Sequence, residues 1–165
     1  MKAKVSEGMI QPINVRIDER LIHGQVAAVW TKTLSIDRIV VIDDEVVRNP
    51  VQKQLLKTAC PDNCKLSIIS TARAAENFRA DKYAGERPMV IVRWPETLDA
   101  LSKMGIAFDE VVVGNMPNKP GTDMLTKQIF VSGEQRETFK RLSASTKFVV
   151  QLVPLDAKLD LLSAK

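Results

Sequence analysis

The chain has 165 residues, of which 45% are hydrophobic and 27% are charged, and this composition suits one compact globular domain. No apolar run approaches the ~18 residues that would cross a bilayer. The formal net charge is +4, basic and acidic residues are interspersed, and only 5% of residues are aromatic, so the composition argues against nucleic-acid binding. A mildly basic surface would instead speed encounters with an acidic protein partner.

The N-terminal segment differs in pattern from the rest of the chain. Residues 1–12 are predicted to be a polar N-terminal leader, because they lack the continuous apolar centre of a signal peptide. We therefore expect the folded domain to span residues 13–165 and the protein to be cytoplasmic. Beyond the leader, apolar runs alternate with helical patterns, and no internal repeat or low-complexity linker interrupts them.

The apolar runs predict the strands. Runs that are apolar throughout and rich in β-branched residues are typical of strands buried on both faces, as in a parallel sheet covered by helices. We therefore predict a single α/β domain with a central, mostly parallel β-sheet of about seven strands and helices on both faces. The predicted strands are 13–17, 38–42, 65–69, 89–93, 111–114, 127–131 and 147–153.

Amphipathic segments between the strands predict the helices. Asn49 and Pro50 form an N-cap followed by a first-turn proline, and Thr71 can cap the next helix. Gly105 can end the helix that begins near Pro95. Their apolar stripes are expected to pack into the core. The predicted helices are 26–34, 50–59, 71–78, 95–104 and 133–142.

His23 is the only histidine of the chain and follows the first predicted strand. Imidazole is a nucleophile near neutral pH, and the planar forks of arginines such as Arg20 match phosphate oxygens. In open α/β sheets, ligands bind beyond the carboxyl ends of strands, and a helix start offers free N–H groups to an anion. These features predict a phosphoryl relay at His23, with a purely structural histidine at a helix start as the alternative.

Other candidate motifs are weaker. A glycine-rich dinucleotide or Walker loop is missing, and Asp43 and Asp44 are expected in turns or at helix starts. The spacing of Cys60 and Cys64 fits neither a metal site nor a redox pair, so both are expected to be ordinary thiols. We expect no metal and no bound cofactor. An α/β regulatory or nucleotide-binding module without sugar phosphorylation remains an alternative.

The segment RIDERLIHGQVAAVW, residues 16–30, resembles the phosphorylation-site signature of IIB components of the mannose–fructose–sorbose class of the bacterial sugar phosphotransferase system (PTS). Further similarity lies in residues 39–44, 93–97, 113–116 and 151–154, so the resemblance covers about 13–154. One departure is residues 119–128, where relatives often carry a lysine-rich Gly-Lys-Lys-Gln stretch. The family fold is a largely parallel sheet between two helical layers, in agreement with the prediction from the apolar pattern.

The resemblance implies a phosphocarrier and phosphotransferase with a phosphohistidine intermediate. A phosphorylated IIA protein would donate to His23, and His23 would pass the group to the sugar imported by the membrane partners IIC and IID. The protein would thus be a protein-N(π)-phosphohistidine–sugar phosphotransferase, cytoplasmic and associated peripherally with the membrane transporter. Family members use Nδ1 of the histidine. Sugar selectivity is expected to lie mainly in the membrane subunits.

The candidate catalytic residues are His23 and Arg20. His23 is the phosphoryl acceptor and then the donor, and Arg20 would neutralise the phosphoryl oxygens as charge spreads in the transition state. Asp18 is expected to fix the loop or to orient the imidazole.

Three further residues are candidates for phosphate binding or support. Arg16 comes from the strand end and could assist or could equally pair with an acidic residue. Gly24 would let the backbone approach the phosphate without a Cβ. Arg93 ends the fourth predicted strand, which would lie beside the first strand in a 3-2-1-4 order. Gln25 is expected to belong to the loop or the helix start.

Overall fold

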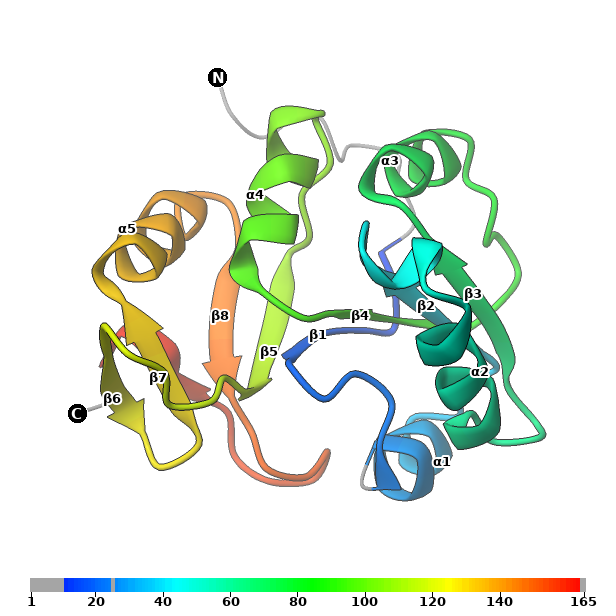
Figure 1. Cartoon of the computed structure of the whole chain (residues 1–165), viewed down its shortest axis with the longest axis horizontal. Helices are drawn as coiled ribbons and strands as arrows, with labels where there is room; N and C mark the ends of the chain where they lie inside the picture. Colours follow the sequence, from blue (N-terminus) through cyan, green and yellow to red (C-terminus); the bar gives the residue numbers. More distant parts are fainter. Residues whose placement is uncertain (1–10, 25, 164–165) are drawn as a thin grey trace.

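The computed structural model describes residues 11–24 and 26–163. Most of the predicted leader, residues 1–10, and the expected role of Gln25 lie outside the described residues. The described chain forms a central sheet with helices on either side, and a small hairpin beside one edge (Figure 1). The described part has no helix with the length and apolar character of a membrane span.

The central sheet has seven strands in the order β3-β2-β4-β1-β5-β8-β9. Every neighbouring pair is parallel except β8 and β9, which confirms the predicted mostly parallel sheet. The predicted 3-2-1-4 order is wrong, because β4 lies between β2 and β1, although β4 does neighbour β1. The strands are β1 (Asn14–Asp18), β2 (Arg38–Ile42), β3 (Lys65–Ile69), β4 (Pro88–Val92), β5 (Glu110–Asn115), β8 (Lys147–Val150) and β9 (Leu159–Asp160).

One predicted strand of the central sheet lies elsewhere. The segment predicted at 127–131 is β7 (Ile129–Ser132), which pairs antiparallel with β6 (Thr122–Thr126) in a separate two-stranded sheet. Lys127 and Gln128 join the two strands, and so short a connection permits only antiparallel pairing. The seventh place in the central sheet belongs to the short strand β9, which the sequence pattern did not predict.

Helices occupy the predicted segments, with local differences at their starts. Asn49 caps α2 as predicted, whereas Ser70, not Thr71, caps α3 with its side chain. The predicted helix 26–34 begins as a π-helical turn, η2 (Val26–Trp30), and continues as α1 (Thr31–Thr33). The other helices are η3 (Val46–Arg48), α2 (Pro50–Ala59), α3 (Thr71–Arg79), α4 (Pro95–Lys103), α5 (Gly133–Leu142) and η4 (Leu161–Ser163).

Alternating strand residues build a core on each face of the sheet. Val15 and Ile17 of β1 belong to the cluster that includes buried residues of α3, α4 and α5. The opposite cluster contains Trp30 of η2 and Leu56 of α2, and Figure 1 shows α1 and α2 together on that side. Because side chains alternate along a strand, Arg16 lies between Val15 and Ile17 but faces the α1 and α2 side, where it meets Trp30.

Candidate functional site

The loop after β1 is a tight turn held by buried apolar side chains. The Leu21 N–H donates to the Asp18 carbonyl at 3.0 Å. Leu21 has φ +57°, in the left-handed region that bulky residues rarely adopt. Its side chain and that of Ile22 are buried in the cluster around Trp30. This burial stabilises a backbone shape that leucine alone would not favour, so the loop presents the next residue, His23, in a fixed position.

Asp18 is the centre of the site, and its carboxylate is fully buried. Arg20 donates to it from the backbone N–H at 3.0 Å, from Nε at 3.0 Å and from Nη2 at 3.1 Å. Arg16 donates from Nε at 3.2 Å and places Nη2 at 3.2 Å from the same carboxylate. His23 Nε2 lies 3.0 Å from Oδ2. The structure thus brings together four of the predicted residues, which we name the Asp18 cluster (Arg16, Asp18, Arg20 and His23).

The charge of Asp18 follows from these contacts. Burial by itself would raise the pKa of the carboxyl group, but hydrogen bonds from His23 and Arg20 and the charge of Arg16 outweigh it. The pKa of Asp18 therefore lies well below its usual range. At neutral pH the centre of the site is an ionised carboxylate shielded from water.

This carboxylate fixes the tautomer of the neutral imidazole. An ionised carboxylate only accepts hydrogen bonds, so His23 must carry its proton on Nε2 in order to donate to Asp18. Nδ1 then bears the lone pair, and it has no hydrogen-bond partner among residues 11–24 and 26–163. The His23 side chain is 18% exposed. The imidazole can therefore act as a nucleophile through Nδ1.

The two arginines of the cluster differ in exposure. The Arg20 side chain is 43% exposed, while its Nε and Nη2 hold Asp18. The Arg16 side chain is 2% exposed. Burial lowers the pKa of Arg16, and the charge of Asp18 offsets part of this effect. Arg20 is accessible to an incoming anion. Arg16 is buried and contacts Asp18.

Gly24 follows His23 in the chain, whereas Arg93 contacts a carboxylate outside the Asp18 cluster. The structure pairs Arg93 Nε with Asp43 Oδ2 at 3.6 Å, and no hydrogen bond joins Arg93 to the Asp18 cluster within the described chain. Asp43 also accepts from the backbone at the start of η3, which confirms its predicted turn role. Among the described residues other than its chain neighbours, a Cβ on Gly24 would meet nothing within 4 Å.

Asp44, Cys60 and Cys64 are not part of the Asp18 cluster. Asp44 accepts from the backbone and the hydroxyl of Thr71, at 2.8 and 3.1 Å, which agrees with its predicted place at a helix start. Cys60 and Cys64 are free thiols, and burial raises the pKa of Cys60 to about 11, so it is protonated at neutral pH. Across the described residues, no group of three or more His, Cys, Asp or Glu is placed to hold a metal ion.

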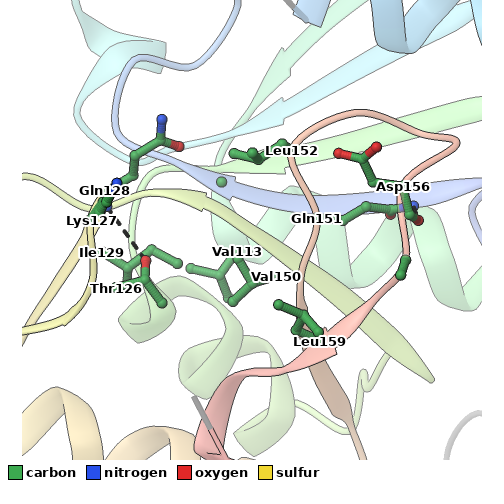
Figure 2. Close-up of a pocket in the computed structure, with 12 residues that line it drawn as sticks. Val113, Thr126, Lys127, Gln128, Ile129, Val150, Gln151, Leu152, Asp156 and Leu159 are labelled. Atoms are coloured by element: carbon green, nitrogen blue, oxygen red, sulfur yellow. Dashed lines mark hydrogen bonds between the residues drawn. The ribbon is translucent and has the colours of Figure 1, made fainter. Parts of the chain in front are cut away.

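A cavity of about 320 Å³ adjoins the site at the carboxyl ends of β5 and β8. Figure 2 shows Val113 and Val150 on its floor, between the turn of the β6–β7 hairpin and the segment that follows β8. Its lining is mostly apolar, and Gly114 belongs to it. Gly114 also contacts Arg16, a role that sequence reasoning missed, although the Val113–Met116 segment is one of the stretches of family similarity.

Comparison with known proteins identifies the family. Residues 13–164 match the family model described as the PTS system sorbose subfamily IIB component. The chain therefore belongs to this family of sugar phosphotransferase IIB components. It is 31% identical over 149 residues to the sorbose-specific EIIB component of Lacticaseibacillus casei, covering 90% of this chain and 91% of that protein.

Other relatives agree with this assignment. The chain is 35% identical over 148 residues to the mannose-specific EIIAB component of Escherichia coli K12. The matched region covers 89% of this chain but 46% of that protein, so the chain spans about half the length of such relatives. The crystal structure of the IIBSor domain of the sorbose permease from Klebsiella pneumoniae matches with a TM-score of 0.86 and 28% identity, over 94% of this chain and 96% of that one. The predicted fold class is thereby confirmed.

Proposed function

We propose that this IIB component carries a phosphoryl group on Nδ1 of His23, from a phosphorylated IIA protein to a sugar imported by the membrane partners IIC and IID. The observation that carries the proposal is the contact between His23 Nε2 and the buried, ionised Asp18, which leaves Nδ1 as the free nucleophile. The protein would work in the cytoplasm, in peripheral association with the membrane subunits. The chain's own side chains supply the chemistry of this proposal, which involves no metal or cofactor.

In the first step, the Nδ1 lone pair of His23 attacks phosphorus. A nitrogen–phosphorus bond forms, and the bond from phosphorus to the donor atom of the IIA protein breaks, with its electron pair going to that atom. The ring of His23 then bears Nε2–H and phosphorylated Nδ1, and its positive charge faces the Asp18 carboxylate at 3.0 Å. Because Asp18 is already ionised and fixed, it stabilises this charge without rearranging.

In the second step, a sugar hydroxyl oxygen attacks the same phosphorus. An oxygen–phosphorus bond forms, the hydroxyl proton passes to solvent water, and the bond to Nδ1 breaks with its electron pair returning to His23. The partly exposed Arg20 would neutralise the phosphoryl oxygens in both steps, as charge spreads in a loose transition state. The absence of a Cβ at Gly24 would leave room for those oxygens.

Incubation with phosphorylated IIA from the same cell tests the proposal. The wild-type protein should take up acid-labile, base-stable phosphate, and His23→Gln should take up none because the chain has no other histidine. Lys140→Gln, at an exposed position of α5, is the matched control and should behave as wild type. Added membranes with IIC and IID should then complete sugar phosphorylation. Labelling of His23→Gln at the wild-type rate would refute the proposal.

The rival functions give different results in the same assay. A regulatory module would accept phosphate on His23 but would not support sugar phosphorylation with the membranes. A nucleotide-binding module would show neither reaction and would bind nucleotide instead.

A further inference from the structure

Gly114 is the unpaired residue of a β-bulge beside the site. Ile17 of β1 lies opposite Val113 of β5, but the next residue, Asp18, lies opposite Asn115. Two residues of β5 thus oppose one of β1, an arrangement that re-aims side chains and is common next to active sites. Past the bulge, the Glu19 N–H donates to the Asn115 carbonyl at 3.1 Å, so β5 also holds the loop that leads to the histidine.

The absence of a side chain at Gly114 leaves room for Arg16. A Cβ on Gly114 would overlap three atoms of the Arg16 guanidinium group, Nη2, Cζ and Nε, the last of them at 2.8 Å. The backbone itself does not require glycine, because Gly114 does not have a positive φ, unlike Gly105 or Gly121. The need for glycine here is therefore one of space. With any other residue, the buried guanidinium or the strand must shift.

Trp30 also packs against the Arg16 guanidinium. The Arg16 Cζ lies 4.9 Å from the centre of the Trp30 ring, a stacking distance for a guanidinium on an aromatic face. Arg16 Nη1 is buried and has no hydrogen-bond partner among the residues that the structure describes. That edge of the guanidinium is held by packing alone, so its position depends on Trp30 and Gly114.

We propose that Gly114 is a positioning residue for phosphoryl transfer: with Trp30 it forms a clamp that holds Arg16 against Asp18 and, through Asp18, aims Nδ1 of His23. The inference rests on the proposed function of His23. It extends the site to β5, more than ninety residues further along the chain, where Gly114 acts through its contact with Arg16. A displacement of about 1 Å at a reacting group can cost on the order of a hundredfold in rate.

Gly114→Ala tests the clamp, with Gly133→Ala as its matched control. A Cβ on Gly133 would meet nothing within 4 Å, and Gly133 lies at the start of α5, outside the Asp18 cluster. Gly114→Ala should slow transfer from phosphorylated IIA by on the order of ten- to a hundredfold, and Gly133→Ala should leave the rate unchanged. A wild-type rate in folded Gly114→Ala would overturn the proposal.

A double-mutant cycle with Arg16→Lys separates positioning from a general structural role. Lysine has no planar fork to overlap the new methyl group, so the alanine at 114 should cost little in that background. If Gly114→Ala alone fails to fold, the double variant should recover the fold. An equal loss of rate in both backgrounds, or misfolding in both, would overturn the proposal, because the clash would not be with Arg16.

Nuclear magnetic resonance gives a readout that does not depend on transfer. The Nε–H signal of Arg16, which reports its bond to Asp18, and the ring nitrogens of the single histidine should shift in Gly114→Ala and not in Gly133→Ala. If phosphorylated IIA does not label even the wild-type protein, the proposed function fails. The comparison of signals between Gly114→Ala and Gly133→Ala still tests the clamp in that case. Unchanged signals in Gly114→Ala would refute the clamp even where the proposed function holds.

Discussion

Replacing Asp18 by asparagine keeps the shape of the side chain and removes the charge on which Arg16, Arg20 and His23 converge. The buried guanidinium of Arg16 would then lose its counterion, because Asp18 is the carboxylate with which it pairs in the described chain. The amide group could either accept from Nε2–H or donate to a bare Nε2, because Nε2 is the ring nitrogen that faces residue 18. Asparagine would thus no longer select the tautomer with the free Nδ1.

The expected losses are large because the carboxylate is fully buried. Removing one partner of a buried ion pair costs about 3–5 kcal/mol of stability, since the other charge is left uncompensated. That is a large part of the roughly 5–15 kcal/mol that keeps a domain folded. Losing the group that fixes a catalytic histidine tautomer has cost on the order of 10⁴-fold in another enzyme, and we expect a loss of 10²- to 10⁴-fold here.

Urea unfolding at pH 7 and the rate of phosphoryl transfer from IIA measure the two effects. Arg16→Met combined with Asp18→Asn removes the stranded charge, and it should recover part of the stability but not the rate. Asp44→Asn, a carboxylate outside the cluster, is the control for transfer. If Asp18→Asn unfolds at the wild-type urea concentration and transfers phosphate at the wild-type rate, Asp18 is not the centre of the site.

The same carboxylate makes stability depend on pH. The pKa of Asp18 is lower in the folded than in the unfolded chain, so its contribution is complete above the unfolded value, about 4, and is lost as pH falls below it. Wild type should therefore lose stability below pH ~4 more steeply than Asp18→Asn. Parallel profiles for the two proteins would contradict the depressed pKa.

Two further predictions concern Arg20 and the encounter with IIA. Arg20→Lys keeps the charge but removes the planar fork that holds Asp18 and would meet the phosphoryl oxygens. Phosphoryl transfer should therefore slow by on the order of ten- to a thousandfold, as measured by stopped-flow kinetics. Wild-type rates in both directions would exclude Arg20 from the mechanism. The basic protein should meet an acidic IIA face through charge, so the second-order transfer rate should fall between ~0.05 and ~0.5 M salt, and a flat profile would mean that apolar contacts drive the encounter.

The fold was predictable where local pattern decides structure. Strands β2 and β4 are apolar runs buried on both faces, and Asn49–Pro50 marks the start of α2. The β6–β7 hairpin was missed as such because β6 is half-exposed and polar, without the apolar run on which the strand predictions depended. β4 lies between β2 and β1 in the sheet. The local sequence pattern of a buried strand does not encode which parallel strands become its neighbours.

The site was predictable to the extent that one loop contains it. Asp18, Arg20 and His23 lie within six consecutive residues, and their chemistry is visible in the sequence. Gly114 and Trp30 act through a bulge and a stacking contact that only the fold brings to Arg16. Both lie in stretches of family similarity, but their types alone suggest an ordinary glycine and an ordinary core aromatic, and the similarity does not say that they contact Arg16.

The position of the phosphoryl group on the imidazole tests the central claim most directly. The protein, with its ring nitrogens labelled with ¹⁵N, is phosphorylated by IIA, and coupling between phosphorus and each ring nitrogen is measured by nuclear magnetic resonance. We expect phosphorus on Nδ1 of His23, with Nε2 still protonated and hydrogen-bonded to Asp18. Phosphorus on Nε2, or on any residue other than His23, would contradict the account.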